Sequence, residues 1–163
     1  MLYADIQGEV EVIGLRTVAA LCALSFCVFA AGDPFSGTWK LNPSKSKLPL
    51  PMPRSQTVHI KAGSRSIRIR EEVVEEDGKR LTVTVKARFD GKDYAVAGSP
   101  FADAVAYQRV DSHTLKGTVK KAGKVVTSET ATISADGKTL TGTYSGIDAT
   151  GKQVDAVAVL ERR

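Results

Sequence analysis

The stretch Phe35–Leu41 reads Phe-Ser-Gly-Thr-Trp-Lys-Leu and carries the only tryptophan of the chain. Its residues favour an extended strand, and prolines bound it at Pro34 and Pro43. Gly37 lies two positions before Trp39, so both would sit on the same face of that strand. A residue without a side chain beside a large ring leaves space for a close approach. The stretch therefore predicts a first strand that places Trp39 in the core of a β-domain.

From Gln56 onward, residues suited to a buried face alternate with residues suited to a solvated face, with a period of two. The clearest case is 81–89, where Leu, Val, Val, Ala and Phe alternate with Thr, Thr, Lys and Arg. Such alternation is typical of a strand with one buried and one solvated face. We expect strands near 36–41, 56–61, 66–76, 80–89, 92–97, 103–109, 114–121, 124–134, 138–146 and 153–161.

Gly-Lys pairs separate these strand-like runs, and they begin at Gly78, Gly91, Gly123, Gly137 and Gly151. Glycine supplies positive φ at a tight turn without steric cost, so Asp-Gly is a strong hairpin signal. The chain therefore predicts an all-β fold, an antiparallel up-and-down β-barrel of eight to ten strands, because closure removes exposed strand edges. An open two-sheet sandwich is the alternative.

The tripeptide Gly37-Thr38-Trp39 near the start of a small β-domain resembles the G-x-W signature of lipocalins and the wider calycin group. The string 37–47 is also similar to the opening of small bacterial secreted lipocalin-like proteins of unassigned function, as are the strings 107–115 and 134–141. This resemblance covers roughly residues 33–161 and implies a barrel, without a ligand or a reaction. It also implies an arginine lying across the Trp39 face, from Arg109 or Arg162.

The N-terminal region predicts a secretory signal peptide over residues 1–30, followed by one domain over residues 31–163. Thr17–Ala31 is uncharged and mostly apolar, and it is too short to span a bilayer comfortably. Val28-Phe29-Ala30 places small residues at the two positions that a signal peptidase recognises. A membrane anchor and a lipid on Cys27 are the weaker alternatives, because Gly32-Asp33-Pro34 breaks the apolar run and bulky Phe26 precedes the cysteine.

The first residues depart from an ordinary signal peptide, because Asp5, Glu9 and Glu11 stand where positive charge is usual. This pattern indicates that translation starts downstream, near Val12 or Leu15, so that residues 1–14 are not part of the protein. Export then predicts a periplasmic or secreted protein without a stable membrane anchor after cleavage.

Cleavage after Ala30 is testable directly. Secreted or periplasmic material should begin near Ala31, because the apolar run and its cleavage site would be removed during export. N-terminal sequencing of the purified protein measures this. Retention of residues 1–16, or a lipid on Cys27, would contradict it.

The charge and the cysteines exclude several function classes. Cys22 and Cys27 both lie inside the predicted signal, so the mature domain has no disulfide and no thiol nucleophile. Removing residues 1–30 takes away one arginine and three acids, which raises the net charge from +5 to +7. The basic residues are spread along the strands rather than clustered, so we expect no nucleic-acid partner. We expect a monomer.

The later strands carry small residues at the positions expected to face inward. They are Gly117, Val119, Thr127, Ala131, Gly142, Ala156 and Ala158. Small inward residues leave room in a barrel for one small, partly apolar or amphiphilic ligand. Trp39, Tyr107 and Tyr144 are the rings expected to line that lumen, and Arg70 and Arg109 are the first choices for a cation that binds an acidic head group. The alternative is a structural or protein-interaction barrel with a filled core and no ligand.

No catalytic constellation stands out, so we expect a binding protein rather than an enzyme, with no cofactor and no metal. The only histidines, His59 and His113, are expected to be solvated or capping residues. The acidic run of Glu71, Glu72, Glu75 and Glu76 is expected to be a solvated strand edge.

The proline-rich connection over residues 42–54 is unusually long for a compact β-protein. Asn42 followed by Pro43 suits an N-cap and the first position of a short helical turn. The rest of the connection is expected either to run over the surface as a plain linker or to cover one mouth of the barrel as a lid.

Overall fold

The computed structural model describes residues 32–49, 51–147 and 152–163. The signal peptide predicted over residues 1–30 lies outside the described residues. The described chain forms ten strands and one 3₁₀ turn. They are β1 (Gly37–Leu41), η1 (Pro43–Lys45), β2 (Ser55–Ala62), β3 (Ser66–Val74), β4 (Arg80–Arg88), β5 (Tyr94–Ala97), β6 (Ala104–Arg109), β7 (Thr114–Lys121), β8 (Lys124–Ile133), β9 (Thr139–Ile147) and β10 (Gln153–Arg162).

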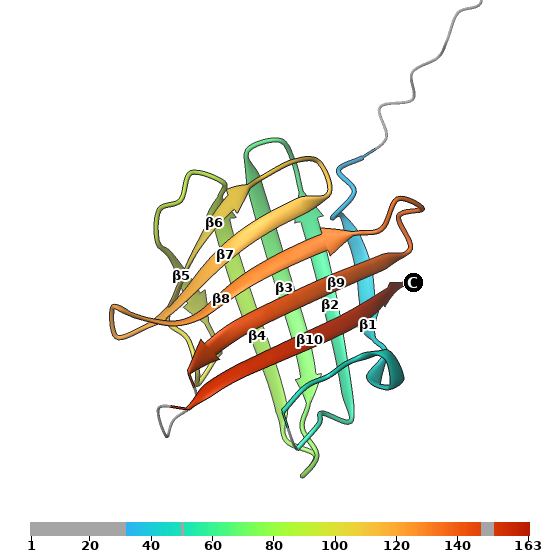
Figure 1. Cartoon of the computed structure of the whole chain (residues 1–163), viewed down its shortest axis with the longest axis vertical. Coiled ribbons are helices and arrows are strands. Elements are labelled where there is room, and N and C mark those ends of the chain that lie inside the picture. Colours follow the sequence, from blue (N-terminus) through green and yellow to red (C-terminus); the bar gives the residue numbers. More distant parts are fainter. Residues whose placement is uncertain (1–31, 50, 148–151) are drawn as a thin grey trace, which may run out of the picture.

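The strands form one closed antiparallel barrel in which each strand pairs with its neighbours in the sequence (Figure 1). The turns expected from the Asp-Gly pairs supply the tight reversals. Gly137, for example, adopts φ +69° between β8 and β9. An up-and-down β-barrel is therefore confirmed, and the sandwich alternative is wrong because β1 pairs with β10 and closes the sheet.

The short strand β1 closes the barrel, and Trp39 lies at its centre. Trp39 is paired with Val58 of β2 on one side and with Arg162 of β10 on the other. Its side chain has no accessible surface, and Phe35 just before the strand is also buried. The first strand and its core tryptophan are confirmed.

The barrel has two unlike ends. At the closed end, Phe35 and Trp39 pack against Ile67 and Ile133, all of them buried. The opposite end is formed by the β3–β4 hairpin, the loop between β5 and β6, and the start of β8. Exposed apolar side chains lie around this open end at Phe101, Val125 and Ile147. Buried side chains thus fill the closed end of the barrel, and the interior is reached from the open end.

The long connection after β1 begins as predicted and then follows the barrel wall. The Asn42 side chain accepts a hydrogen bond from the Lys45 N–H and caps η1. Lys47 forms a bridge with Val157, so the chain continues along β10 after β1 has ended. Pro51 and Pro53 then border a second recess beside the open end, and neither lines the main cavity. These two prolines therefore lie at the rim of the barrel and do not cover the lumen as a lid.

Candidate ligand-binding cavity

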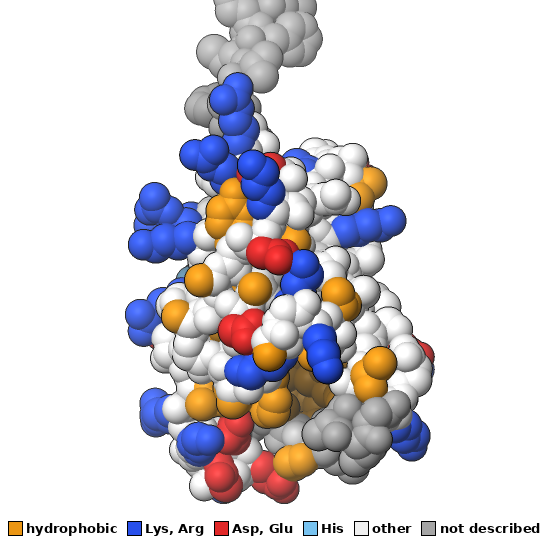
Figure 2. Space-filling model, turned by 90° about the vertical axis from the view of Figure 1, so that its left-hand side faces the viewer, with side chains coloured by type: hydrophobic (Ala, Val, Ile, Leu, Met, Phe, Trp, Pro, Cys, Tyr) orange, Lys and Arg blue, Asp and Glu red, His pale blue; other side chains and the backbone are white. Residues whose placement is uncertain are grey.

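A cavity of about 410 Å³ occupies the inside of the barrel. Most of its wall is apolar, with Val58, Ile69, Val85 and Leu115 among its residues, and Phe101 lies at its open end. Figure 2 shows a recess lined by apolar side chains in the lower half of the face turned to the viewer. The volume falls in the usual range for small-molecule pockets. The barrel interior is therefore not filled by its own side chains.

One row of residues crosses five neighbouring strands at the same level and carries the polar groups of the cavity. The backbone register joins Tyr107 of β6 to Gly117, Gly117 to Glu129 of β8, Glu129 to Tyr144, and Tyr144 to Ala156 of β10. Paired residues in antiparallel strands point to the same face. The tyrosines and the glutamate of this row therefore project together into the lumen, and all three line the cavity.

Two glycines make room for these side chains. A Cβ atom on Gly117 would come within 2.9 Å of the Glu129 Cδ, and one on Gly142 would come within 3.0 Å of the Tyr144 ring. Real Cβ atoms do not approach other atoms so closely without a shift of the neighbour. The small inward residues predicted from the sequence thus accommodate protein side chains as well as empty space.

Burial governs the protonation of this row. It raises the pKa of Glu129 to about 7; the hydrogen bond with Tyr107 lowers it, and the nearby charge of Glu71 raises it further. Burial also raises the pKa of Tyr107 well above its ordinary value, with the charge of Glu129 as the next cause. The pKa of Tyr144 is raised by the same two causes in the same order. Glu129 is therefore partly protonated near neutral pH.

A second carboxyl faces this row from the opposite wall. Glu71 of β3 lines the cavity and accepts a hydrogen bond from the Gln56 side-chain amide. Burial raises its pKa, and the hydrogen bond from Gln56 lowers it. The charges of Glu71 and Glu129 interact, so the two carboxyls oppose each other's ionisation.

These pKa shifts predict a pH-dependent stability. The pKa of Glu129 is raised from 4.5 to about 7, so its contribution to the free energy of unfolding is present below pH 4.5 and is lost as the pH rises through 7. We expect a loss on the order of 2 kcal/mol, since water that reaches the lumen screens the carboxylate. Urea denaturation from about pH 5 to about pH 8 measures it, and Glu129→Gln should remove this part of the slope.

Glu72→Gln is the matched control, because Glu72 is exposed on the outer face and pairs there with Arg70. It should leave the slope unchanged. An equal slope in wild type and Glu129→Gln would show that Glu129 titrates as an ordinary solvated carboxyl.

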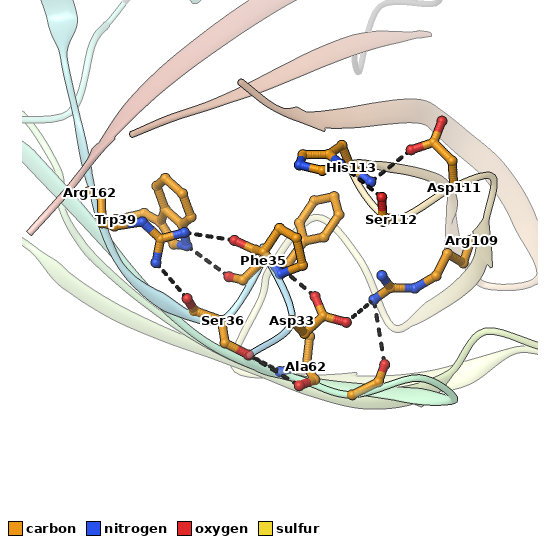
Figure 3. A network of polar contacts seen from close by, with 12 residues as sticks. Asp33, Phe35, Ser36, Trp39, Ala62, Arg109, Asp111, Ser112, His113 and Arg162 are labelled. Carbon is orange, nitrogen blue, oxygen red and sulfur yellow. Dashed lines mark hydrogen bonds and ion pairs between the residues drawn. The ribbon is translucent and has the colours of Figure 1, made fainter. Parts of the chain in front are cut away.

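A network of polar contacts seals the closed end (Figure 3). The Arg162 guanidinium lies over the Trp39 ring, 4.1 Å from its centroid. It donates hydrogen bonds to the carbonyl oxygens of Pro34 at 2.7 Å, Ser36 at 2.6 Å and Gly137 at 2.6 Å. The Trp39 indole N–H donates to the Phe35 carbonyl at 3.0 Å. Of the two arginines expected across the Trp39 face, Arg162 is therefore the correct one.

Gly37 permits this arrangement. Its φ of +150° is rarely adopted by residues with side chains, and a Cβ atom there would collide with the Arg162 guanidinium. The spacing between Gly37 and Trp39 that the sequence singled out is thus explained: the missing side chain admits the arginine that covers the ring.

Three of the five expected ligand-binding residues lie away from the cavity. Trp39 does not line it, because Arg162 and Phe35 enclose the ring at the closed end. Arg70 is exposed on the outer face and pairs with Glu72 at 2.8 Å, since alternation along β3 turns it outward. These two assignments to the lumen are wrong.

Arg109 is also outside the lumen, although it lies on the inner face of β6. It forms an ion pair with Asp33 at 2.6 Å and lies over the Phe89 ring, 4.4 Å from its centroid. The segment before β1 thus captures this arginine at the closed end (Figure 3). Tyr107 and Tyr144 do line the cavity. Their contact with a ligand stays a prediction.

Sequence reasoning missed the two carboxyls, although the pattern contained a signal for both. Glu129 stands midway between Thr127 and Ala131, which were expected to face inward. Glu71 lies two positions from both Ile69 and Val73, so it shares their inward face. Its assignment to a solvated edge was therefore wrong. A charged residue in phase with inward apolar neighbours is the feature that marks both.

Other chemistry is not evident in the described parts of the chain. Within them, no three His, Cys, Asp or Glu side chains gather as a metal site would require. His59 contacts the Thr38 hydroxyl, and His113 contacts Ser112. None of the helices found in the described ranges is long and apolar enough to cross a membrane.

Comparisons with known proteins bear on the fold. The chain matches no family model and no curated protein. Among solved structures, the zebrafish ileal bile acid-binding protein complexed with cholic acid superposes with a TM-score of 0.52 at 14% identity, covering 80% of this chain and 99% of that one. Apocrustacyanin C2 and lobster apocrustacyanin A1 give TM-scores of 0.45 and 0.44 at 13% identity, covering 80% of this chain and 62% and 61% of theirs. With ten strands in one closed meander, the chain has the calycin-type barrel fold that the lipocalin resemblance implied.

Proposed function

We propose that the protein is exported and that its barrel binds one small, partly apolar molecule inside the lumen. The observation that carries this proposal is the cavity of about 410 Å³, which is enclosed by ten paired strands and reached from one end. An unfilled apolar lumen favours ligand binding over the structural barrel with a filled core. The zebrafish neighbour, which has the same kind of fold, is complexed with cholic acid.

The strand pairing and the exposed apolar side chains agree with a monomeric binding protein. All ten strands are paired in a ring, so the sheet offers no free edge to a second copy. Exposed apolar side chains at Phe101, Val125 and Ile147 surround the open end, where an apolar molecule would pass. We infer a monomer that acts in the periplasm or outside the cell, without catalysing a reaction.

Decan-1-ol, an uncharged amphiphile, tests lumen binding. It should raise the melting temperature by several degrees at saturating concentration, because a ligand that binds only the folded state stabilises that state by mass action. Differential scanning calorimetry and isothermal titration calorimetry measure the shift and the stoichiometry. One molecule per chain is expected.

A lumen-filling variant locates the binding. Ala131 lines the cavity, so Ala131→Trp should fill part of it and abolish the shift. Ser128→Trp adds the same ring at an exposed position on the same strand and should leave binding unchanged. Circular dichroism confirms that both variants fold. A decanol response that survives in Ala131→Trp would place the binding elsewhere and overturn the proposal.

A further inference from the structure

The cavity is acidic, which is unexpected for a domain with an excess of basic residues. Its lining includes the carboxyls of Glu71, Glu75 and Glu129, and no Lys, Arg or His is among the described residues that line it. The described arginines that the sequence offered as ligand cations are used elsewhere, Arg70 on the outer face and Arg109 against Asp33. The charge inside the barrel is therefore complementary to a cation, not to a carboxylate.

Glu129 is positioned to contact a ligand. It projects from β8 into the lumen at the level where Gly117 leaves space beside it. Among the described residues, its only hydrogen-bond partner is Tyr107. A carboxylate has about four acceptor sites on its two oxygens, so most of its acceptor capacity is unused.

Tyr144 supplies an independent sign that a polar ligand group belongs at this level. Its side chain is half-buried, and the ring lines the cavity. Its hydroxyl has no hydrogen-bond partner among the described residues, although it lies near the charges of Glu129 and Glu71. A hydroxyl that faces the lumen without a protein partner is free to bond with a polar group of a ligand.

The opposite wall completes the site. Glu71 approaches from β3, and its charge acts on both Glu129 and Tyr144. Gln56 of β2 occupies one of its acceptor sites. Two carboxyls that oppose each other's ionisation in an apolar cavity would both be relieved by one positive group between them.

Resting on the proposed lumen binding, we propose that the ligand is an amphiphile whose polar end is a primary ammonium group, held by Glu129 and Glu71 with the Tyr144 hydroxyl as a further partner. Its apolar part lies along Val58, Ile69 and Val85. Near neutral pH, binding moves a proton from Glu129 to the buffer, because the ligand keeps its positive charge and stabilises the carboxylate. The ionisable side chains that line the cavity are Glu71, Glu75, Glu129, Tyr107 and Tyr144.

Decylamine, decan-1-ol and decanoate test this assignment, since they share a chain and differ only in the polar end. Titration calorimetry of the mature wild-type protein near neutral pH should show decylamine binding at least about tenfold more tightly than decanoate. Repeating the decylamine titration in buffers of different ionisation enthalpy should reveal proton release. Affinity for decylamine should rise with pH through about 7, the pKa of Glu129.

Matched variants separate this site from general packing. Glu129→Gln and Glu71→Gln keep the side-chain size and should each reduce the preference for the amine, while decan-1-ol binding stays within about threefold. Tyr144→Phe removes only the unpartnered hydroxyl and should weaken decylamine more than decan-1-ol. Glu72→Gln removes the same charge from the outer face and should change neither.

The outcomes distinguish the two proposals. If decan-1-ol binds in the lumen and decanoate binds as tightly as decylamine, the ammonium assignment is overturned while lumen binding stands. The same conclusion follows if the preference for decylamine survives in the double variant Glu71→Gln/Glu129→Gln. If none of the three probes binds, both proposals fail.

Discussion

Trp39→Ala is expected to lower the free energy of unfolding by about 3–5 kcal/mol. The ring has no accessible surface, its N–H donates to the Phe35 carbonyl at 3.0 Å, and Arg162 covers its face. Removing it leaves a cavity between β1 and the closed end and deprives the guanidinium of its aromatic partner. Urea denaturation followed by circular dichroism measures the loss, since the variant has no tryptophan emission.

Phe101→Ala is the control, because Phe101 is 74% exposed at the open end and should change stability by no more than about 0.5 kcal/mol. The wild-type protein adds a second measurement. Its tryptophan emission should be blue-shifted when folded and should move to longer wavelength on unfolding. Native emission like that of tryptophan in water, or equal stabilities of Trp39→Ala and wild type, would remove Trp39 from the core.

Arg162→Met is expected to cost about 3 kcal/mol, because it removes a charged donor from three backbone carbonyls at once. The carbonyls belong to Pro34, Ser36 and Gly137, so the residue joins the segment before β1 to the turn between β8 and β9. Arg162→Lys should not restore the stability, since an ammonium group lacks the planar fork that reaches all three acceptors. Denaturation measures both variants.

Arg70→Met is the matched control for the loss of an arginine. Its ion pair with Glu72 is exposed, and exposed pairs contribute only about 0–1 kcal/mol. If both variants lose a similar free energy of unfolding, the network at the closed end stabilises the protein no more than an exposed ion pair does. Hydrogen exchange gives a further test, because Arg162→Met should release protection around Ser36 before the rest of the barrel opens.

Much of the fold is determined by local sequence. The period of two sets which residues share a face, and the turn glycines set where each strand reverses, so all ten strands lie close to their expected ranges. The first strand was predicted in the same local way, from its β-propensity and the prolines that bound it. These features depend on neighbours in the chain and can be predicted without the tertiary structure.

The candidate site was predicted only in part. Tyr107 and Tyr144 line the cavity as expected, and small inward residues leave it partly empty. Arg70 was predicted to line the lumen because an acidic ligand was assumed. It directly follows the inward-facing Ile69, so strand alternation turns it outward. Arg109 has the correct face, but Asp33 meets it at the closed end, and no pattern within β6 reveals that partner.

The sequence by itself determined an all-β meander and the ranges of its strands, because alternation and turn chemistry act over a few residues. Only the tertiary structure decided what the lumen contains. Closure brings Glu71 opposite Glu129, which is 58 positions away in the chain, and Gly117 gives that carboxyl room on the inside. A charged residue is ordinarily placed in solvent, and only the closed ring of strands turns these two toward one another in an apolar cavity.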